Sequence, residues 1–256
     1  MRQPDPPSRC TIVHPSEPHP APVSVSRMQE IDRTAIDRFK IPRLLLMDHA
    51  GLALAHAASA LRSGSSATAA AAPATGSPQR ASPILLCCGT GYNGGDGLSA
   101  ARHLHAWGIP LHVLVAGRRA QLRDEPATYA TILERLGVSL AECLTSEDVE
   151  VSSHWMSDAS VIIDALLGIG MRGPVREPIR SLIDRMNCSG KPIVAADIPS
   201  GLDGDSGHPQ GIAVKAAVTV AFGSPKQGCF MHEGPAHAGA LTVDPITLPR
   251  ALLEAP

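Results

Sequence analysis

Residues 84–97 constrain the fold of this chain more than any other stretch. Five apolar residues, Ile-Leu-Leu-Cys-Cys, lead directly into Gly-Thr-Gly-Tyr-Asn-Gly-Gly-Asp-Gly, and an apolar segment follows from Leu98 to Trp107. A short apolar run bounded by glycine is typical of a strand that is buried on both faces. The stretch therefore predicts a strand, a glycine loop over 89–97 and a helix that starts at Leu98. The N–H groups at such a helix N-terminus can hold an anion.

Gly89, Gly91 and Gly94 also match the G-x-G-x-x-G fingerprint of dinucleotide-binding folds. Two features oppose an ordinary NAD site. The next strand, expected at 111–115, is followed by Ala-Gly-Arg-Arg and not by the acid that would bind a ribose. In addition, the charge of Asp96 within the loop would repel a pyrophosphate. Asn93 and Asp96 instead indicate a loop that handles a cation or the polar groups of a substrate.

Composition narrows the classes of function. With 256 residues, 44% of them hydrophobic, the chain can build one sizeable α/β domain. A formal net charge of −2 and an aromatic content of 3% give no reason to expect nucleic acid or a membrane as a partner. The six cysteines include no C-x-x-C pair, which favours reduced thiols in a cytoplasmic protein. No apolar run approaches the ~18 residues of a membrane span, and no signal-peptide pattern opens the chain, so neither is expected.

The rest of the chain predicts a disordered, proline-rich tail at 1–22 and a single domain over 23–256, with a low-complexity loop at 62–83. Ser26 and Gln29 can form a capping box in the first helix. The small pair Ala50-Gly51 would let another backbone approach closely. Further helices are expected at 42–61, 124–136 and 175–186, and further strands at 111–115, 138–140, 160–163, 192–196, 214–222 and 240–243.

This alternation predicts a Rossmann-like, three-layer α/β/α sandwich around a mostly parallel sheet. Ligands of such sheets bind outside the carboxyl ends of the strands. Three polar loops leave strand ends there, at 89–97, 164–174 and 197–205. If their strands are neighbours, Asn93, Asp96, Asp164, Asp197 and Ser200 converge on one rim. The two strand-end aspartates also fit helix caps or turns, and the serine fits a turn, so the residues alone leave both interpretations open.

Several separated motifs together resemble the NAD(P)H-hydrate epimerases, which are built on the YjeF N-terminal domain. The motifs are the glycine loop at 89–97, Asp-Ala-Leu-Leu-Gly at 164–168 and Asp-Ile-Pro-Ser-Gly-Leu-Asp at 197–203, and residues 28–32, 46–51 and 222–228 also fit. The resemblance covers about residues 24–250. It implies an isomerase of nicotinamide cofactor repair, which interconverts the R and S epimers of hydrated NADH and NADPH. A separate dehydratase that accepts only the S form would act next.

The resemblance also implies the residues of the site. Substrate contacts fall on Tyr92, Asn93, Gly94, Gly95, Asp96, Gly168, Ile169, Gly170, Met171, Arg172, Gly173, Pro174 and Asp197. It implies a potassium ion bound by Asn93, Asp164 and Ser200, which all offer the oxygen ligands that a hard cation requires. Asp197 is our candidate for the general acid and base. Tyr92 and Pro174 depart from the family's pattern, which commonly has an asparagine at the first position and often an acid at the second.

Two other classes of function stay open. The same fold occurs in non-enzymatic scaffolds, including messenger-RNA decapping enhancers, where the domain dimerises. A homodimer of this protein is therefore also left open by the sequence. The other class is an NADP-dependent oxidoreductase with Arg118 near the 2′-phosphate, although no set of residues for hydride transfer is evident.

Overall fold

The computed structural model describes residues 12–13, 21–64 and 82–254. The strands in these ranges are β1 (Ile12–Val13), β2 (Ile84–Cys88), β3 (Leu111–Ala116), β4 (Leu140–Cys143), β5 (Val161–Ala165), β6 (Ile193–Ala196), β7 (Val218–Phe222) and β8 (Ala240–Asp244). The α-helices are α1 (Val25–Asp37), α2 (Arg43–Arg62), α3 (Tyr92–Ala106), α4 (Asp124–Arg135), α5 (Ser146–Asp158), α6 (Ile179–Cys188), α7 (Gly234–Ala238) and α8 (Arg250–Leu253). Short 3-10 helices lie at Arg119–Gln121 and Gln227–Phe230.

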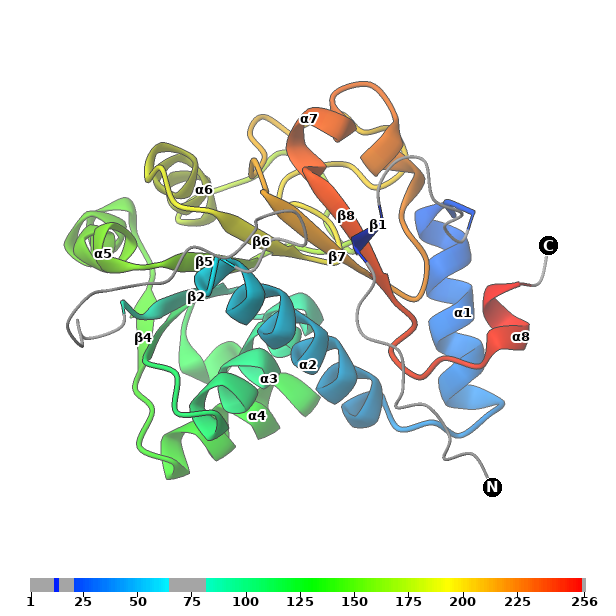
Figure 1. The fold of residues 1–256 in the computed structure, drawn as a ribbon, viewed down its shortest axis with the longest axis horizontal. Helices are drawn as coiled ribbons and strands as arrows, with labels where there is room; N and C mark the ends of the chain where they lie inside the picture. The colour runs from blue at the N-terminus through cyan, green and yellow to red at the C-terminus, as the bar shows by residue number, and fades with distance from the viewer. Residues whose placement is uncertain (1–11, 14–20, 65–81, 255–256) are drawn as a thin grey trace.

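The strands form one sheet in the order β1-β8-β7-β6-β5-β2-β3-β4 (Figure 1). Neighbouring strands from β2 to β8 are parallel, and β1 runs antiparallel beside β8. Helices cover both faces, so the predicted Rossmann-like three-layer α/β/α sandwich is confirmed. The strands that precede the three polar loops, β2, β5 and β6, are direct neighbours. The condition for the loops to converge is therefore met.

Alternate side chains of the strands pack against different helices. Ile84, Leu86 and Cys88 of β2 belong to the core shared with α1, α2, α3 and α4. Leu85 and Cys87 belong to the core shared with α5 and α6. Because successive residues of a strand point to opposite faces, a run of five apolar residues is what a strand covered on both sides requires.

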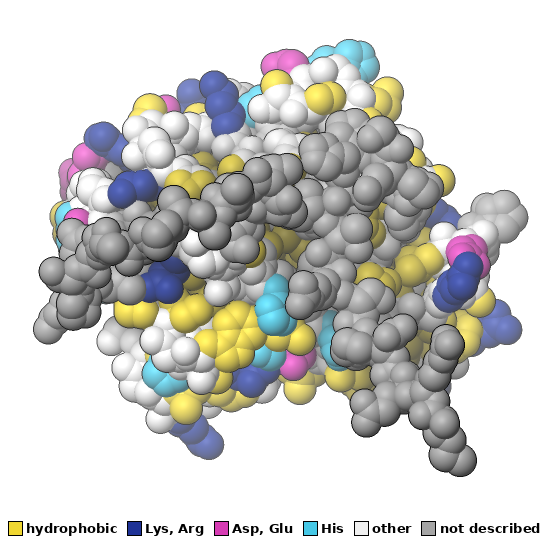
Figure 2. Space-filling view, in the orientation of Figure 1, with side chains coloured by type: hydrophobic (Ala, Val, Ile, Leu, Met, Phe, Trp, Pro, Cys, Tyr) yellow, Lys and Arg dark blue, Asp and Glu magenta, His cyan; other side chains and the backbone are white. Residues whose placement is uncertain are grey.

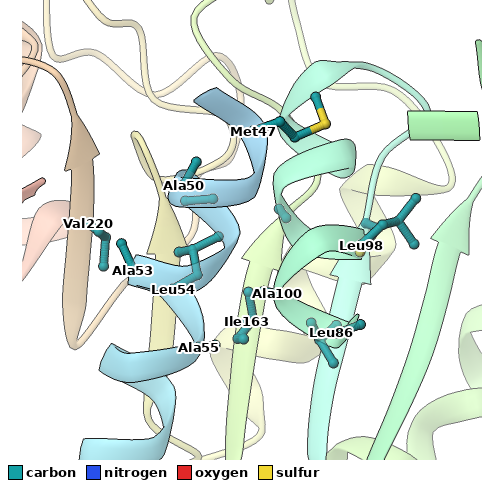
Figure 3. Close-up of a cluster of buried hydrophobic side chains, with 14 of the residues drawn as sticks. Met47, Ala50, Ala53, Leu54, Ala55, Leu86, Leu98, Ala100, Ile163 and Val220 are labelled. Carbon is teal, nitrogen blue, oxygen red and sulfur yellow. The ribbon is translucent and has the colours of Figure 1, made fainter. Parts of the chain in front are cut away.

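The helices α2 and α3 pack side by side against the sheet. Figure 3 shows Ala53 and Leu54 of α2 within the cluster that includes Val220 of β7 and Ile163 of β5. A Cβ atom at Gly51 would collide with the side chain of Ser99 in α3, so the predicted close approach of another element is confirmed. Among the described helices, α2 is long and apolar enough to cross a membrane by length and composition. Its contacts with the sheet and with α3 are those of a core helix.

Three helix starts differ from the prediction, and the first two are those of α3 and α1. The helix α3 begins at Tyr92, not at Leu98, because the later glycines of the loop already belong to its first turns. The helix α1 is capped by Ser24, whose Oγ accepts a hydrogen bond from the N–H of Arg27 at 3.2 Å, and not by a capping box of Ser26 and Gln29. Glycine disfavours helix interiors on average, and tertiary packing overrides that preference here.

The helix α5 was missed. Its residues are mostly polar, and Val149 and Met156 are its two buried positions. The local signal was present, because Thr145 and Asp148 form a reciprocal capping box at its start. The helix predicted at 175–186 begins instead at Ile179.

The predicted tail at 1–22 and the loop at 62–83 fall mostly outside the described residues. Within the tail, Ile12–Val13 is described, and it pairs with Leu241 and Thr242 of β8.

Figure 2 shows Lys and Arg side chains singly or in small groups on one face of the molecule, among hydrophobic, acidic and His side chains.

Candidate active site

The glycine loop brings the start of α3 close to the sheet. A Cβ atom at Gly94 would overlap the carbonyl oxygen of Gly89, and one at Gly97 would lie 2.6 Å from Cβ of Ala165 and 2.8 Å from Sγ of Cys88. Since only glycine leaves this space, α3 packs directly on β2 and β5. Its N-terminus is thereby fixed at the carboxyl edge of the sheet.

A cleft of about 760 Å³ opens at this edge. It is bounded by α1, α2, the start of α3, and the segments that follow β5, β6 and β7. The predicted substrate residues that line it are Tyr92, Asn93, Asp96, Gly168, Ile169, Gly170, Met171 and Asp197. A smaller cavity of about 280 Å³ adjoins it, shares residues 168–171 and includes Arg172.

The remaining predicted substrate residues do not line either cavity. Gly94 and Gly95 are buried at the base of the loop, where a Cβ atom at Gly95 would meet the side chain of Met47 at 2.7 Å. Gly173 and Pro174 lie beyond the smaller cavity in the chain and line neither space. For the two buried glycines the structure shows a packing role.

Asp197 is held at the edge of the cleft by an unusual backbone conformation. Its φ angle is 66°, in the left-handed region that aspartate tolerates better than most residues. This conformation lets its N–H donate to the carbonyl oxygen of Val220 at 2.8 Å while its Oδ1 accepts from the N–H of Phe222 at 3.0 Å. Its side chain is about one-tenth exposed. Both bonds join the end of β6 to β7.

Lys226 completes the setting of Asp197. Its Nζ donates to Oδ1 of Asp197 and, at 3.0 Å, to the carbonyl oxygen of Phe222, and its side chain is 1% exposed. Among the described residues, no hydrogen bond reaches Oδ2 of Asp197. The sequence analysis did not place Lys226 in the site. Its position four residues after the strand end at Phe222 was the available signal.

Two further carboxyl groups face the same cleft. Asp32 comes from α1 and Asp96 from the second turn of α3. Burial raises the pKa of Asp32 from 3.8 to about 6; Lys226 opposes the rise, Asp197 adds to it and Arg43 opposes it. Burial also raises the pKa of Asp96 well above its ordinary value, and the charges of Asp197 and Asp32 add to the rise. The cleft therefore holds three carboxyl groups around one buried ammonium group.

Asp32 was not predicted as a site residue. It lies next to the buried Ile31 and four residues after the buried Met28, so it stands at the border of the apolar face of α1. An acid at such a border is the signal that the sequence offered. That signal is weak, because nothing local shows what the helix packs against.

Asp164 and Ser200 lie together beneath the rim. Oδ1 of Asp164 accepts from Oγ of Ser200 at 2.6 Å, and Oδ2 accepts from the N–H of Ser200 at 2.8 Å. Oγ of Ser200 also accepts from the N–H of Leu167 at 2.8 Å. Burial raises the pKa of Asp164 to about 6, although the hydrogen bonds from Ser200 and Leu166 oppose the rise.

Asn93 approaches this pair across the loop after β5. A Cβ atom at Gly168 would lie 3.3 Å from Oδ1 of Asn93, and the neighbouring Leu167 is bonded to Ser200. Nδ2 of Asn93 is buried and has no hydrogen-bond partner among the described residues. The three predicted potassium ligands thus surround one short segment, 166–168.

Tyr92 and Arg43 form the outer wall of the cleft. The guanidinium carbon of Arg43 lies 4.5 Å from the centre of the Tyr92 ring, and its Nη1 donates to the Tyr92 hydroxyl oxygen at 3.1 Å. The hydroxyl group in turn donates to Oδ2 of Asp124 at 3.4 Å. Tyr92, which departs from the family's pattern, therefore holds the guanidinium group of Arg43 at the opening of the cleft.

The fold and the cleft define a Rossmann-like α/β protein with a polar ligand site at the carboxyl edge of a parallel sheet. The chain belongs to the family described as YjeF-related protein N-terminus, whose profile matches residues 44–228. The resemblance inferred from the motifs is thereby confirmed.

Two relatives match this chain over nearly their full length. The NAD(P)H-hydrate epimerase of Limosilactobacillus fermentum is 34% identical over 221 residues, which cover 86% of this chain and 94% of that protein. The NAD(P)H-hydrate epimerase of Rhodopirellula baltica is 30% identical over 231 residues, which cover 91% of this chain and 87% of that protein.

Other relatives are longer. The bifunctional NAD(P)H-hydrate repair enzyme Nnr of Pyrobaculum aerophilum is 39% identical over 224 residues, which cover 87% of this chain and 41% of that protein. The chain thus spans about two fifths of the length of this bifunctional relative. The crystal structure of yeast YNL200c matches with a TM-score of 0.74 at 24% identity over 91% of each chain, which supports the fold.

Proposed function

We propose that this protein is an NAD(P)H-hydrate epimerase, an isomerase that interconverts the R and S epimers of hydrated NADH and NADPH. The observation that carries the proposal is the convergence of Asp32, Asp96, Asp197 and Lys226 on one cleft. This arrangement occurs in a chain that matches epimerases over nearly their whole length. A cleft of about 760 Å³ is within the range of small-molecule sites, roughly 300–1,000 Å³.

The reaction requires proton transfer at a carbon that bears both a hydroxyl group and the ring nitrogen. The configuration inverts when the hydroxyl group leaves and returns, or when the ring opens and recloses. Either route needs a group that gives and takes a proton within hydrogen-bond reach. Asp197 suits this role because Lys226 and Phe222 fix its Oδ1, while its Oδ2 has no hydrogen bond from the described residues.

The donor set around 166–168 fits a potassium ion. Asp164, Ser200 and Asn93 all offer oxygen atoms, as a hard cation requires. The buried Nδ2 of Asn93 has no partner, and turning the amide end over would present its oxygen at that place instead. A bound potassium ion would supply positive charge beside the substrate and hold the loop 166–168 in place.

The proposal extends to partners and location. The bifunctional relatives combine the matched region with a further stretch of chain, and we place a dehydratase that removes the S epimer next in the same repair sequence. The free thiols of Cys87, Cys88, Cys143, Cys188 and Cys229 suit the reducing conditions of the cytoplasm.

The test follows a purified R epimer of hydrated NADPH by chromatography that separates the epimers, with and without the protein and potassium. We expect the approach to the R/S equilibrium to be faster than the spontaneous rate, and faster in potassium than in tetramethylammonium. The Ser200→Ala variant should lose the difference between the two salts. No acceleration by the protein, with the dinucleotide still bound, would refute the enzyme and support the non-enzymatic scaffold.

A further inference from the structure

Asp32 is the group in the cleft whose chemistry the assignments above leave unused. It comes from α1 and lines the same cleft as Asp197. No described residue forms a hydrogen bond or an ion pair with its carboxyl group. Its backbone is fixed, because Met28, Ile31 and Ala35 of the same helix are buried in the core. A carboxyl group that is held in place without a bonding partner is available to a ligand.

The charged groups around Asp32 act on its pKa in opposite directions. The charged groups that act on it are Asp197 after β6, Lys226 after β7 and Arg43 of α2, and Asp96 of α3 interacts with it in turn. The ammonium group of Lys226 is bonded to Asp197 and not to Asp32. Carboxyl groups that share a site in this way separate into one that keeps its charge and one that holds a proton.

Asp96 is the other candidate for the proton-holding group. Burial, together with the charges of Asp197 and Asp32, raises its pKa well above the ordinary value and so favours its protonated form. A protonated carboxyl group can donate a hydrogen bond to a substrate. Asp32 has a pKa of about 6, and a catalytic acid or base works best when its pKa lies near the operating pH.

Inversion by loss and return of the hydroxyl group requires proton transfer on both faces of the ring. The leaving oxygen needs a proton on one face, and the incoming water must lose one on the other. A single carboxyl group on one face serves only half of this exchange.

We propose that Asp32 is a second catalytic residue and forms an acid–base pair with Asp197 across the cleft. The proposal rests on the epimerase function proposed above. In one direction, the C–O bond breaks with its electron pair on oxygen, which takes the proton of Asp32 and leaves as water. The lone pair of the ring nitrogen forms a C=N bond.

A water molecule then adds to the opposite face. Its oxygen forms the new C–O bond, the C=N pair returns to nitrogen, and the proton passes to Asp197. One water leaves and one enters, the ring is neither oxidised nor reduced, and one proton has moved from Asp32 to Asp197. The reverse epimerisation, or exchange with solvent, resets the pair.

Because one proton is shared by the two groups, both directions of the reaction need the singly protonated pair. Turnover should therefore fall as the pH rises above about 6, the pKa of Asp32, in the R-to-S and S-to-R directions alike. A residue with a merely structural role would not set this limb of the pH profile.

The test compares kcat, KM and the pH profile of the wild type with Asp32→Asn, Asp32→Glu and Glu30→Gln. Glu30 is an exposed carboxyl group of the same helix that does not line the cleft. We expect Asp32→Asn to lower kcat by about 10²- to 10⁴-fold, with KM little changed and the limb near pH 6 absent. Asp32→Glu should restore the limb and part of the rate, and Glu30→Gln should behave as the wild type.

Two results would overturn the inference while the proposed function stands. One is a wild type that accelerates epimerisation together with an Asp32→Asn variant of equal kcat. The other is an Asp32→Asn variant that is slow but keeps the limb near pH 6, since another group then sets it. A wild type that gives no acceleration would refute the function and the inference together.

Discussion

Replacing Asp32 by Asn should stabilise the folded protein at pH 8 and leave its stability almost unchanged at pH 4. The pKa of this carboxyl group rises from 3.8 to about 6 on folding. Between these values the folded state binds more protons than the unfolded state, so the free energy of unfolding falls as the pH rises through this window. Above it, the full cost of the buried charge is present.

The size of the effect follows from the same values. A tenfold change in proton affinity is worth about 1.4 kcal/mol, so a rise from 3.8 to about 6 corresponds to roughly 3 kcal/mol. An isosteric amide carries no charge and removes this cost at pH 8. At pH 4 the carboxyl group is mostly protonated in the folded state, so the exchange removes little.

Urea unfolding followed by circular dichroism at pH 4 and pH 8 measures the difference. The control is Glu30→Gln, because Glu30 is exposed and its ion pair with Arg27, at 3.0 Å, is of the kind that contributes about 0–1 kcal/mol. If Asp32→Asn is no more stable than the wild type at pH 8, or gains equally at both pH values, the reasoning is wrong. A gain confined to pH 8, paired with the loss of activity predicted above, would mean that the site costs stability for the sake of function.

Two further variants test how the site is built. Lys226→Met leaves the buried carboxylate of Asp197 without its cation and should lower the free energy of unfolding in urea by about 3–5 kcal/mol. Part of this loss should be recovered in the Lys226→Met, Asp197→Asn double variant. A loss below about 1 kcal/mol would show that the pair is not buried as described. Gly94→Ala places a Cβ atom on the carbonyl oxygen of Gly89 and should cost about 1–3 kcal/mol. Its control is Gly91→Ala, where the added Cβ atom meets nothing within 4 Å; equal losses in thermal unfolding would contradict the packing argument.

The sequence by itself determined the layered α/β fold and the edge of the sheet where the site lies. The apolar run at 84–88 needs cover on both faces, and the glycines after it need close approach, whatever the rest of the chain does. The aspartates at 164 and 197 follow apolar runs of the same kind. These signals are local, since each depends on residues within about ten positions.

Only the tertiary structure decided which charged groups share the cleft. From the sequence, Asp32 is only a residue at the border of a helix face, and its role depends on the position of α1 beside the ends of β6 and β7. From the sequence, Lys226 is only a loop residue, whereas the structure buries it against Asp197. The start of α3 at Tyr92 was likewise set by packing, because glycine lowers helix propensity where the sheet demands its small size. The pKa of a buried carboxyl group depends on every group that excludes water from it or carries a charge near it, and those groups come from distant parts of the chain.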